Sequence, residues 1–205
     1  MATLLPSTRP APRPTVFNVP NQLTLGRFVL ALVLFALIHY ELWVWCLIVF
    51  AVAAFTDWLD GYLARKQNLT STLGRNLDPL VDKVLICGTY IFLLPLGTRE
   101  GWLVPWMVTV VVAREMVITS LRSYLEMSGA KFGADWLGKL KMGLQCAAIA
   151  AIFIVPGVKN WLTEFEHPLA VMRDGLVYAM IAATLLSGLQ YLWRALQMYR
   201  ADAIP

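Results

Sequence analysis

Long apolar segments alternate with short polar ones along almost the whole chain. Each apolar segment has roughly 17–25 residues, the length at which an α-helix crosses a bilayer. Turn-forming residues separate several of them, such as Gly97 to Gly101 and Pro156-Gly157. We therefore predict an all-α polytopic membrane protein with six transmembrane helices, at residues 23–39, 42–63, 77–94, 102–124, 137–155 and 175–198.

The composition supports this architecture. Hydrophobic residues make up 59% of the 205 residues, charged residues only 15%, and the mean hydropathy is +0.63. Soluble domains of ordinary composition are less apolar, and the closely spaced segments leave no room for a separate soluble domain. We expect a disordered proline-rich tail at 1–15, a six-helix membrane domain at 16–200 and a C-terminal tail at 201–205. A short organelle-targeting peptide is the alternative interpretation of the first region.

Basic residues are distributed unevenly between the polar connections. The first, third and fifth connections carry only Arg99, Lys159 and Arg173, whereas the other connections and the N- and C-terminal regions carry most of the rest. Because basic residues collect on the cytoplasmic side of membrane proteins, both termini are expected in the cytoplasm. The net charge of +4 then suits an anionic membrane face rather than a nucleic acid. Tryptophans near predicted helix ends, Trp102 among them, fit anchors at the membrane surface.

Four aspartates interrupt the apolar pattern: Asp57, Asp60, Asp78 and Asp82. An acidic residue in or beside a span costs roughly 2.5–3.5 kcal/mol on insertion scales, so such residues are rare and usually functional. The first two share a helical face at the end of the second predicted span, and the last two share a face at the start of the third. An antiparallel helix pair joined by residues 66–75 would bring the four carboxylates together.

Neighbouring carboxylates ionise together only when cations neutralise them. Oxygen ligands favour a hard ion such as Mg²⁺ or Mn²⁺ over zinc, and such ions usually serve phosphate chemistry. Gly61 permits close approach of a ligand to the backbone, and Arg65 offers a fork suited to a phosphate or a nucleotide. Ser71 and Gly74 add small polar contacts in the connection. Pro79 fits the first turn of the third helix.

Two other interpretations of the aspartates are open. Ordinary loop solvation would explain one or two charges, but not four at helical spacing. An ion channel or a cation transporter also places carboxylates in a membrane, although a transporter needs them near the middle of the bilayer.

The spacing of these residues resembles the signature of the CDP-alcohol phosphotransferases. In one-letter code it reads D-x2-D-G-x2-A-R-x8-G-x3-D-x3-D, from Asp57 to Asp82. The resemblance implies six transmembrane helices, a homodimer, two divalent cations and an active site that faces the cytoplasm. It implies that Asp82 is also the general base. Implied metal ligands are Asp57, Asp60, Asp78 and Asp82, and implied contacts to the CDP moiety are Gly61, Arg65, Ser71 and Gly74.

Two further stretches resemble the phosphatidylglycerophosphate synthase branch of that family. One enters the first predicted span at 18–27, and the other comprises 113–122 followed by 136–141. Relatives commonly carry threonine where this chain has Met142, so a hydroxyl contact is not expected there. The resemblance implies transfer of a phosphatidyl group from CDP-diacylglycerol to sn-glycerol 3-phosphate with release of CMP, among membrane lipids and in a bacterial cytoplasmic membrane.

Basic residues in these stretches predict a site for the acceptor phosphate. An acceptor without comparable negative charge would not need several cations close to its binding site. Phosphatidylglycerol, inositol phosphate and serine stay open as alternative acceptors. The predicted set is Thr24, Arg27, Arg114, Arg122, Lys139 and Lys141.

Some of these residues also have a structural interpretation. Arg114 stands beside Glu115 in an apolar run, where the two can form a buried ion pair. Lys139 and Lys141 cannot fully share a helical face, so one of them can instead neutralise lipid headgroups. Lys83, next to the aspartates, is either a counter-charge or a catalytic residue.

The first predicted span offers a further alternative of this kind. Thr24 and Arg27 fit the start of a helix with an interfacial arginine as well as they fit a phosphate site.

Overall fold

The computed structural model describes residues 19–67, 72–127, 136–158 and 165–202, and the side chains of 22–57, 59, 79–125, 136–158 and 165–198. Six α-helices contain most of the described residues. In chain order they are α1 (Val19–His39), α2 (Trp43–Gln67), α3 (Thr72–Glu100), α4 (Pro105–Met127), α5 (Trp136–Val158) and α6 (Glu166–Asp202).

The prediction of an all-α protein is confirmed, and each predicted helix is present. Within the described parts of the chain, α1, α3, α5 and α6 contain stretches long and apolar enough to cross a membrane, and α2 contains a shorter apolar stretch, Trp43–Asp57. Large apolar side chains cover much of the outside, such as Leu25, Phe55, Leu186 and Trp193. Soluble proteins rarely expose such continuous apolar surface, whereas a lipid-facing protein requires it.

The connection between α2 and α3 is shorter than the sequence indicated. Because α2 continues to Gln67 and α3 begins at Thr72, part of the predicted 66–75 connection is helical. Pro79 therefore lies inside α3, and its expected place in the first turn was wrong. Lys83, one turn later, donates a hydrogen bond from Nζ to the Pro79 carbonyl oxygen at 3.0 Å.

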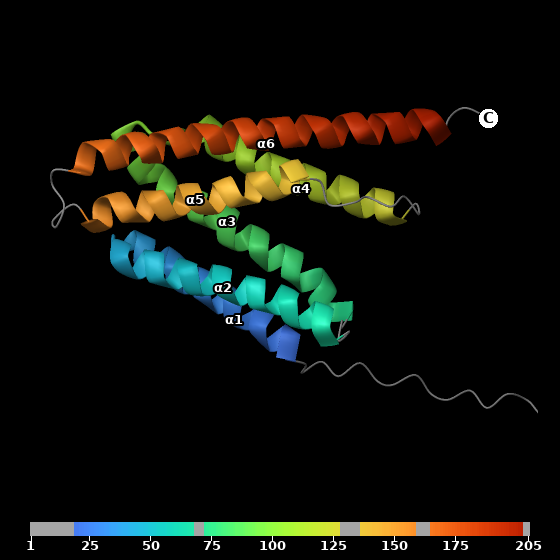
Figure 1. Cartoon of the computed structure of the whole chain (residues 1–205), viewed down its shortest axis with the longest axis horizontal. Helices are drawn as coiled ribbons and strands as arrows, with labels where there is room; N and C mark the ends of the chain where they lie inside the picture. The colour runs from blue at the N-terminus through green and yellow to red at the C-terminus, as the bar shows by residue number, and fades with distance from the viewer. Residues whose placement is uncertain (1–18, 68–71, 128–135, 159–164, 203–205) are drawn as a thin grey trace, which may run out of the picture.

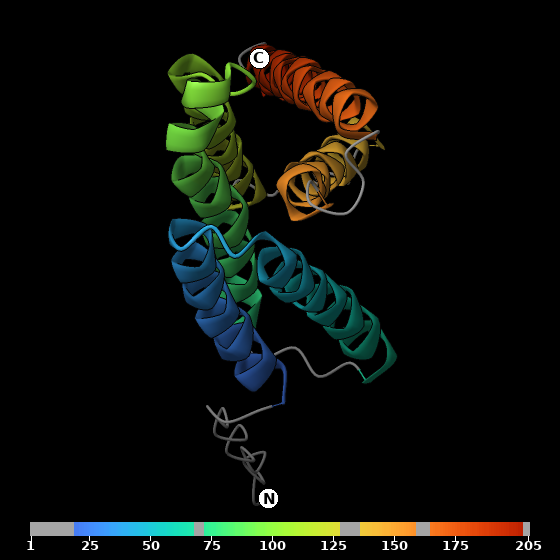
Figure 2. The same cartoon turned by 90° about the vertical axis from the view of Figure 1, so that its left-hand side faces the viewer.

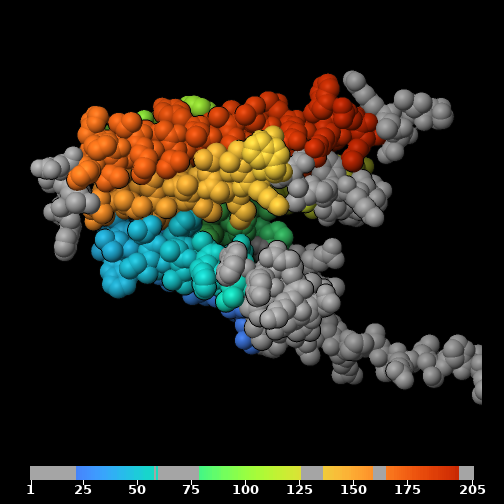
Figure 3. All heavy atoms as spheres, in the orientation of Figure 1, coloured from blue at the N-terminus to red at the C-terminus, as the bar shows by residue number. Residues whose placement is uncertain are grey.

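The helices run alternately in opposite directions. One end of the bundle therefore collects the starts of α1, α3 and α5 and the ends of α2, α4 and α6 (Figure 1). Seen from the side, α1 and α2 lie opposite α5 and α6, and α3 and α4 connect the two pairs (Figure 2). The space-filling view shows α3 at the bottom of a hollow between α2 and α5 (Figure 3). The aspartate motif and the predicted acceptor residues thus share one end of the bundle.

The core holds α3 tightly against α1 and α5. Tyr90 of α3 is fully buried, and its hydroxyl donates a hydrogen bond to the carbonyl oxygen of Gln145 on α5 at 3.1 Å. Gly88 of α3 lies under the ring of Phe35 on α1, where a Cβ atom would stand 2.2 Å from the ring. These contacts fix the position of α3, which carries Asp82.

A polar cluster closes the opposite end of the bundle. Gly101 ends α3 with a positive φ of 85°, a conformation that glycine adopts without strain. The next residue, Trp102, is only 2% exposed, so its expected place as a surface anchor was wrong. Its Nε1 donates to Glu100 at 2.8 Å, and the Arg173 guanidinium covers its ring and pairs with Glu100 at 3.0 Å. This cluster ties α3 to α6 far from the aspartates.

Candidate functional site

A pocket of about 210 Å³ opens at the end of the bundle that carries the aspartate motif. It brings Asp82 of α3 together with Arg114 and Arg122 of α4 and Lys139 and Lys141 of α5. Four of the six predicted acceptor residues therefore line one pocket with the predicted general base. They come from segments far apart in the sequence, and only the packing of α3, α4 and α5 joins them.

Positive charge dominates the wall of this pocket. Among its lining residues are five cations and two carboxylates, namely Lys83, Arg114, Arg122, Lys139 and Lys141 against Asp82 and Glu115. Such an arrangement attracts anions, because low-dielectric walls focus the field of the charges that line a cleft. The pocket suits a small, negatively charged ligand.

A larger and mostly apolar groove of about 820 Å³ borders this pocket. The two share the side chains of Lys83, Thr119 and Arg122, and apolar residues such as Leu80 and Ile91 line the rest of the groove. The charged pocket therefore lies at a border between polar and hydrocarbon-compatible surface.

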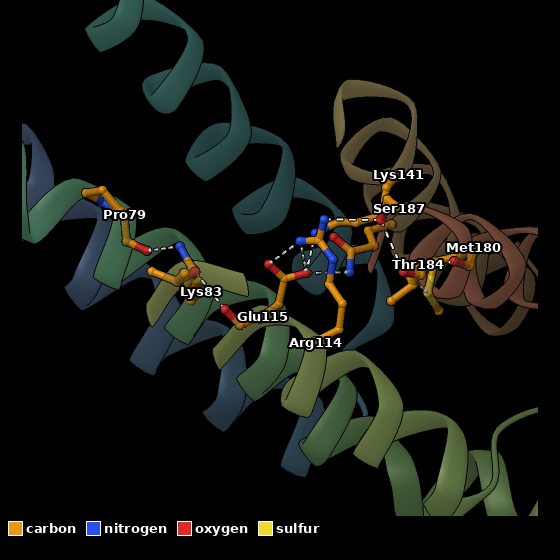
Figure 4. Close-up of polar contacts among 10 residues, drawn as sticks. Pro79, Lys83, Arg114, Glu115, Lys141, Met180, Thr184 and Ser187 are labelled. Atoms are coloured by element: carbon orange, nitrogen blue, oxygen red, sulfur yellow. Dashed lines mark hydrogen bonds and ion pairs between the residues drawn. The ribbon is translucent and has the colours of Figure 1, made fainter. Parts of the chain in front are cut away.

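Glu115 is the centre of a buried ion cluster in the pocket wall (Figure 4). Its carboxylate pairs with the Lys141 ammonium across the α4–α5 contact, and with Arg114 Nη1 at 3.3 Å. Gln145 Nε2 adds a third contact to Glu115 Oε1 at 3.4 Å. The expected Arg114–Glu115 ion pair is present, and Lys141 belongs to it as well.

Helix α6 supports Arg114, a role that the sequence did not indicate. Arg114 Nη2 donates to Ser187 Oγ at 3.1 Å, and the guanidinium stands 5.7 Å from the centre of the Tyr191 ring. Gly188 leaves room for the arginine stem, since a Cβ atom there would lie 3.3 Å from Arg114 Cγ. Small residues such as serine and glycine are common where helices contact each other in membranes. The adjacent Ser187 and Gly188 in an apolar segment were therefore the sequence feature that could have indicated this contact of α6.

Lys139 and Lys141 face different surroundings. Lys141 is buried against Glu115, whereas Lys139 is exposed at the rim of the pocket. The prediction that the two cannot share one helical face is confirmed.

Arg27 of α1 meets the aspartate motif from the other side. The side chain is 1% exposed, and its Nη1 lies 2.6 Å from Oδ1 of Asp57 on α2. Thr24, one turn earlier, is also buried. Neither residue is among those that line the pocket of Asp82. The structure thus places Thr24 and Arg27 beside the α2 part of the motif.

The predicted metal site is described only in part. Asp57 and Asp82 come from α2 and α3, and they are close enough for their charges to repel each other. Helices α2 and α3 both pack against α1 and α5, which hold the two aspartates at this end of the bundle. Among the described side chains, no group of three His, Cys, Asp or Glu residues has the geometry of a metal site. The other motif residues lie outside the described side chains: Asp60, Gly61, Arg65, Ser71, Gly74 and Asp78.

Two carboxylates from separate helices, close enough to repel each other, suit a hard divalent cation. A shared cation would remove their repulsion, and carboxylate oxygens are the ligands that such ions prefer. The described residues are therefore compatible with the predicted metal.

Comparison with known proteins assigns the family. Residues 17–172 match the CDP-alcohol phosphatidyltransferase family. The chain belongs to this family. The match includes α1 to α5, and therefore both halves of the aspartate motif and the cluster around Glu115.

Curated bacterial relatives are similar to this chain over nearly its whole length. A protein of Bacillus subtilis is 34% identical over 201 residues, which cover 89% of this chain and 98% of the relative. A protein of Escherichia coli K12 is 34% identical over 196 residues, with 92% and 98% covered. Both relatives are named CDP-diacylglycerol–glycerol-3-phosphate 3-phosphatidyltransferase.

Proposed function

We propose that this protein transfers the phosphatidyl group of CDP-diacylglycerol to sn-glycerol 3-phosphate, giving phosphatidylglycerophosphate and CMP. The observation that carries the proposal is the pocket in which Asp82 faces several cations. A phosphorylated acceptor needs both features, a base for its hydroxyl and positive charge for its phosphate. The names of the similar bacterial proteins agree with this reaction.

The acceptor phosphate binds to the basic wall of the pocket. Lys141 and Arg122 carry charge at its surface, Lys139 adds charge at the rim, and Arg114 lies in the ion cluster behind it. Several charge-assisted hydrogen bonds of this kind orient a phosphate as well as attract it. Serine, which has no phosphate, would leave most of this charge without a ligand.

Asp82 is the proposed general base. It removes the proton from an acceptor hydroxyl, and the resulting oxygen attacks the phosphorus of the phosphatidyl group. A new oxygen–phosphorus bond forms, and the bond from that phosphorus to the CMP oxygen breaks, so CMP leaves with the bonding electrons. A carboxylate within hydrogen-bond reach of the acceptor hydroxyl can contribute about 10²–10⁴-fold to the rate of such a step.

The four aspartates, Asp82 included, and the other motif residues are assigned to the donor. Asp57, Asp60, Asp78 and Asp82 would bind two divalent cations, Mg²⁺ or Mn²⁺. When bound, these cations neutralise the charge of the diphosphate and of the departing CMP. Contacts to the CDP moiety are assigned to Gly61, Arg65, Ser71 and Gly74. Arg27, next to Asp57, and Thr24 would reach the phosphates of the donor or of the acceptor.

The proposed setting is a bacterial cytoplasmic membrane. Six membrane-crossing helices with both termini in the cytoplasm would put the site at the cytoplasmic surface, where a lipid donor meets a soluble acceptor. The apolar groove beside the charged pocket supports a position at that boundary. A homodimer is proposed from the family resemblance.

An acceptor panel tests the function. Purified protein with CDP-diacylglycerol and Mg²⁺ or Mn²⁺ is mixed with glycerol 3-phosphate, phosphatidylglycerol, inositol phosphate or serine, and CMP release is measured. We expect release with glycerol 3-phosphate and at most traces with the others. If the protein prefers another alcohol, glycerol 3-phosphate is not the acceptor, but the proposed transfer reaction is kept. Cation flux into liposomes without any CMP release would instead support a transporter.

A further inference from the structure

Glu115 is one of the two carboxylates among the described residues of the pocket wall, and unlike Asp82 it has no part in the proposed reaction. Only 7% of it is exposed, and it lies between α4 and α5 rather than at the rim. A buried carboxylate is expensive unless charged partners and hydrogen bonds compensate it. Its presence in the site therefore calls for a function.

Both Glu115 oxygens are already engaged by the protein. Oε1 accepts from Lys141 and from Gln145 Nε2, and Oε2 faces Arg114 Nη1 at 3.3 Å. A carboxylate in this state neither binds a phosphate nor accepts a proton from a substrate. It acts on the groups that surround it.

The pair with Lys141 decides where that ammonium stands. Lysine is long and flexible, and at the start of α5 its ammonium can turn toward water, as the exposed Lys139 does. Glu115 holds the Lys141 ammonium inside the pocket that also contains Asp82. One of the three ammonium donors is used in this contact, so donors remain for a ligand.

Glu115 is itself held from behind. The Gln145 side chain contacts Glu115, and the Gln145 carbonyl oxygen accepts a hydrogen bond from the buried Tyr90 hydroxyl at 3.1 Å. This chain of contacts joins α3, α5 and α4 at one level of the bundle. The position of Lys141 is therefore coupled to the helix that carries Asp82.

We infer that Glu115 is a positioning residue for acceptor selection: it fixes Lys141, with Arg114 beside it, so that the site takes a phosphorylated acceptor. The inference deepens the proposed function and depends on it. The cluster of two cations and one carboxylate keeps a net positive charge while its geometry is fixed, which is the arrangement that a single phosphate group requires.

The test is a comparison of Michaelis constants in the detergent-purified full-length protein. Glu115→Gln keeps the shape of the side chain and removes its charge. We expect its KM for glycerol 3-phosphate to rise on the order of tenfold or more, as for losses of groups that orient a ligand-binding residue. The KM for CDP-diacylglycerol should change less than about twofold, because the donor contacts other residues. Equal changes in both constants would overturn the inference.

A double-mutant cycle separates positioning from general destabilisation. If Glu115 acts through Lys141, then Glu115→Gln combined with Lys141→Met should have nearly the same acceptor KM as Lys141→Met alone. If the double variant instead raises the acceptor KM by the product of the two single effects, the inference is overturned. Glu100→Gln is the matched control, because it removes another carboxylate that pairs with a buried arginine, at the opposite end of the bundle. It should leave both KM values unchanged.

Gln145→Leu tests the same claim if Glu115→Gln does not give folded protein. It keeps every charge of the cluster and removes one hydrogen bond to Glu115. We expect a rise of about two- to fivefold in the acceptor KM alone, and an unchanged constant in folded protein would contradict the inference. Failure of the proposed function itself is recognised separately, because the wild-type protein would then release no CMP with glycerol 3-phosphate.

Discussion

Arg27 and Asp57 form an ion pair of 2.6 Å between α1 and α2, and the arginine is almost completely buried. Asp57 is also the first aspartate of the family motif. A predicted metal ligand is therefore paired with a buried guanidinium, which is not among the residues that line the pocket of Asp82. This relationship links the start of α1 to the aspartates, and it leads to a prediction about metal affinity.

Removing Arg27 should change the metal dependence of the reaction. In Arg27→Met the Asp57 carboxylate loses its cationic partner and becomes more available to a divalent cation. We expect half-maximal activity at a lower Mn²⁺ concentration, together with a lower maximal rate because the proposed phosphate contact of Arg27 is removed. A titration of CMP release against Mn²⁺ measures both. An unchanged or higher Mn²⁺ requirement would show that the pair does not compete with the metal.

Asp82→Asn should abolish turnover without unfolding the protein. The amide keeps the size of the side chain but cannot take the acceptor proton, so the rate should fall by about 10²–10⁴-fold. CDP-diacylglycerol binding should persist and can be followed by thermal shift. Asp174→Asn, at the other end of the bundle, is the control and should keep full activity. Near-normal turnover of Asp82→Asn would remove this residue from the base role.

The two lysines at the start of α5 should contribute unequally. Lys141 is buried in the pocket, and Lys139 is exposed at its rim. Lys141→Met should raise the KM for glycerol 3-phosphate by roughly tenfold to a hundredfold, whereas Lys139→Met should change it by about threefold or less. The smaller effect should also fade at high salt, because exposed charges are screened. Steady-state kinetics at two salt concentrations test the contrast, which equal effects would refute.

Gly188 of α6 should matter for the acceptor although it touches no substrate. A methyl group there would lie 3.3 Å from Arg114 Cγ and would push the arginine stem by a few tenths of an ångström. We expect Gly188→Ala to raise the acceptor KM severalfold, since small misplacements of a positioning group reduce catalysis. Gly175→Ala in the same helix has open space around the new methyl group and should be neutral. Equal acceptor KM values for Gly188→Ala and Gly175→Ala would show that the site tolerates a displaced Arg114.

The cluster at the far end should influence stability alone. Glu100 accepts from Trp102 and pairs with the buried Arg173, and it is partly exposed. Glu100→Gln should therefore lower the free energy of unfolding by about 1–2 kcal/mol. The melting temperature in detergent should fall while kcat/KM stays at the wild-type value. A loss of activity in folded Glu100→Gln would mean that the two ends of the bundle are coupled.

The sequence predicted the helices well because each lies in a long, mostly apolar segment of the chain. It predicted the helix ends poorly at the α2–α3 connection and at Pro79, since polar residues there continue the helices instead of ending them. Trp102 was misjudged because hydropathy does not distinguish a ring that faces lipid from a ring that covers a buried arginine.

The residues of the candidate site were also predicted only in part. Asp82 and the basic residues of α4 and α5 were found from local motifs, and the pocket brings them together. The contribution of α6 was missed, because Ser187, Gly188 and Tyr191 acquire a role only when α6 packs against Arg114. The link from Glu115 to Lys141 joins residues on different helices, and spacing along one helix cannot reveal such a contact.

The most direct test of the central claim follows the acceptor itself. Purified protein is incubated with CDP-diacylglycerol, Mn²⁺ and radiolabelled glycerol 3-phosphate, and the label that enters the chloroform-soluble lipid is counted, with Asp82→Asn as the blank. The account predicts label in lipid, matched mole for mole by released CMP, and none in the blank. CMP release without labelled lipid, or equal labelling by Asp82→Asn, would contradict it.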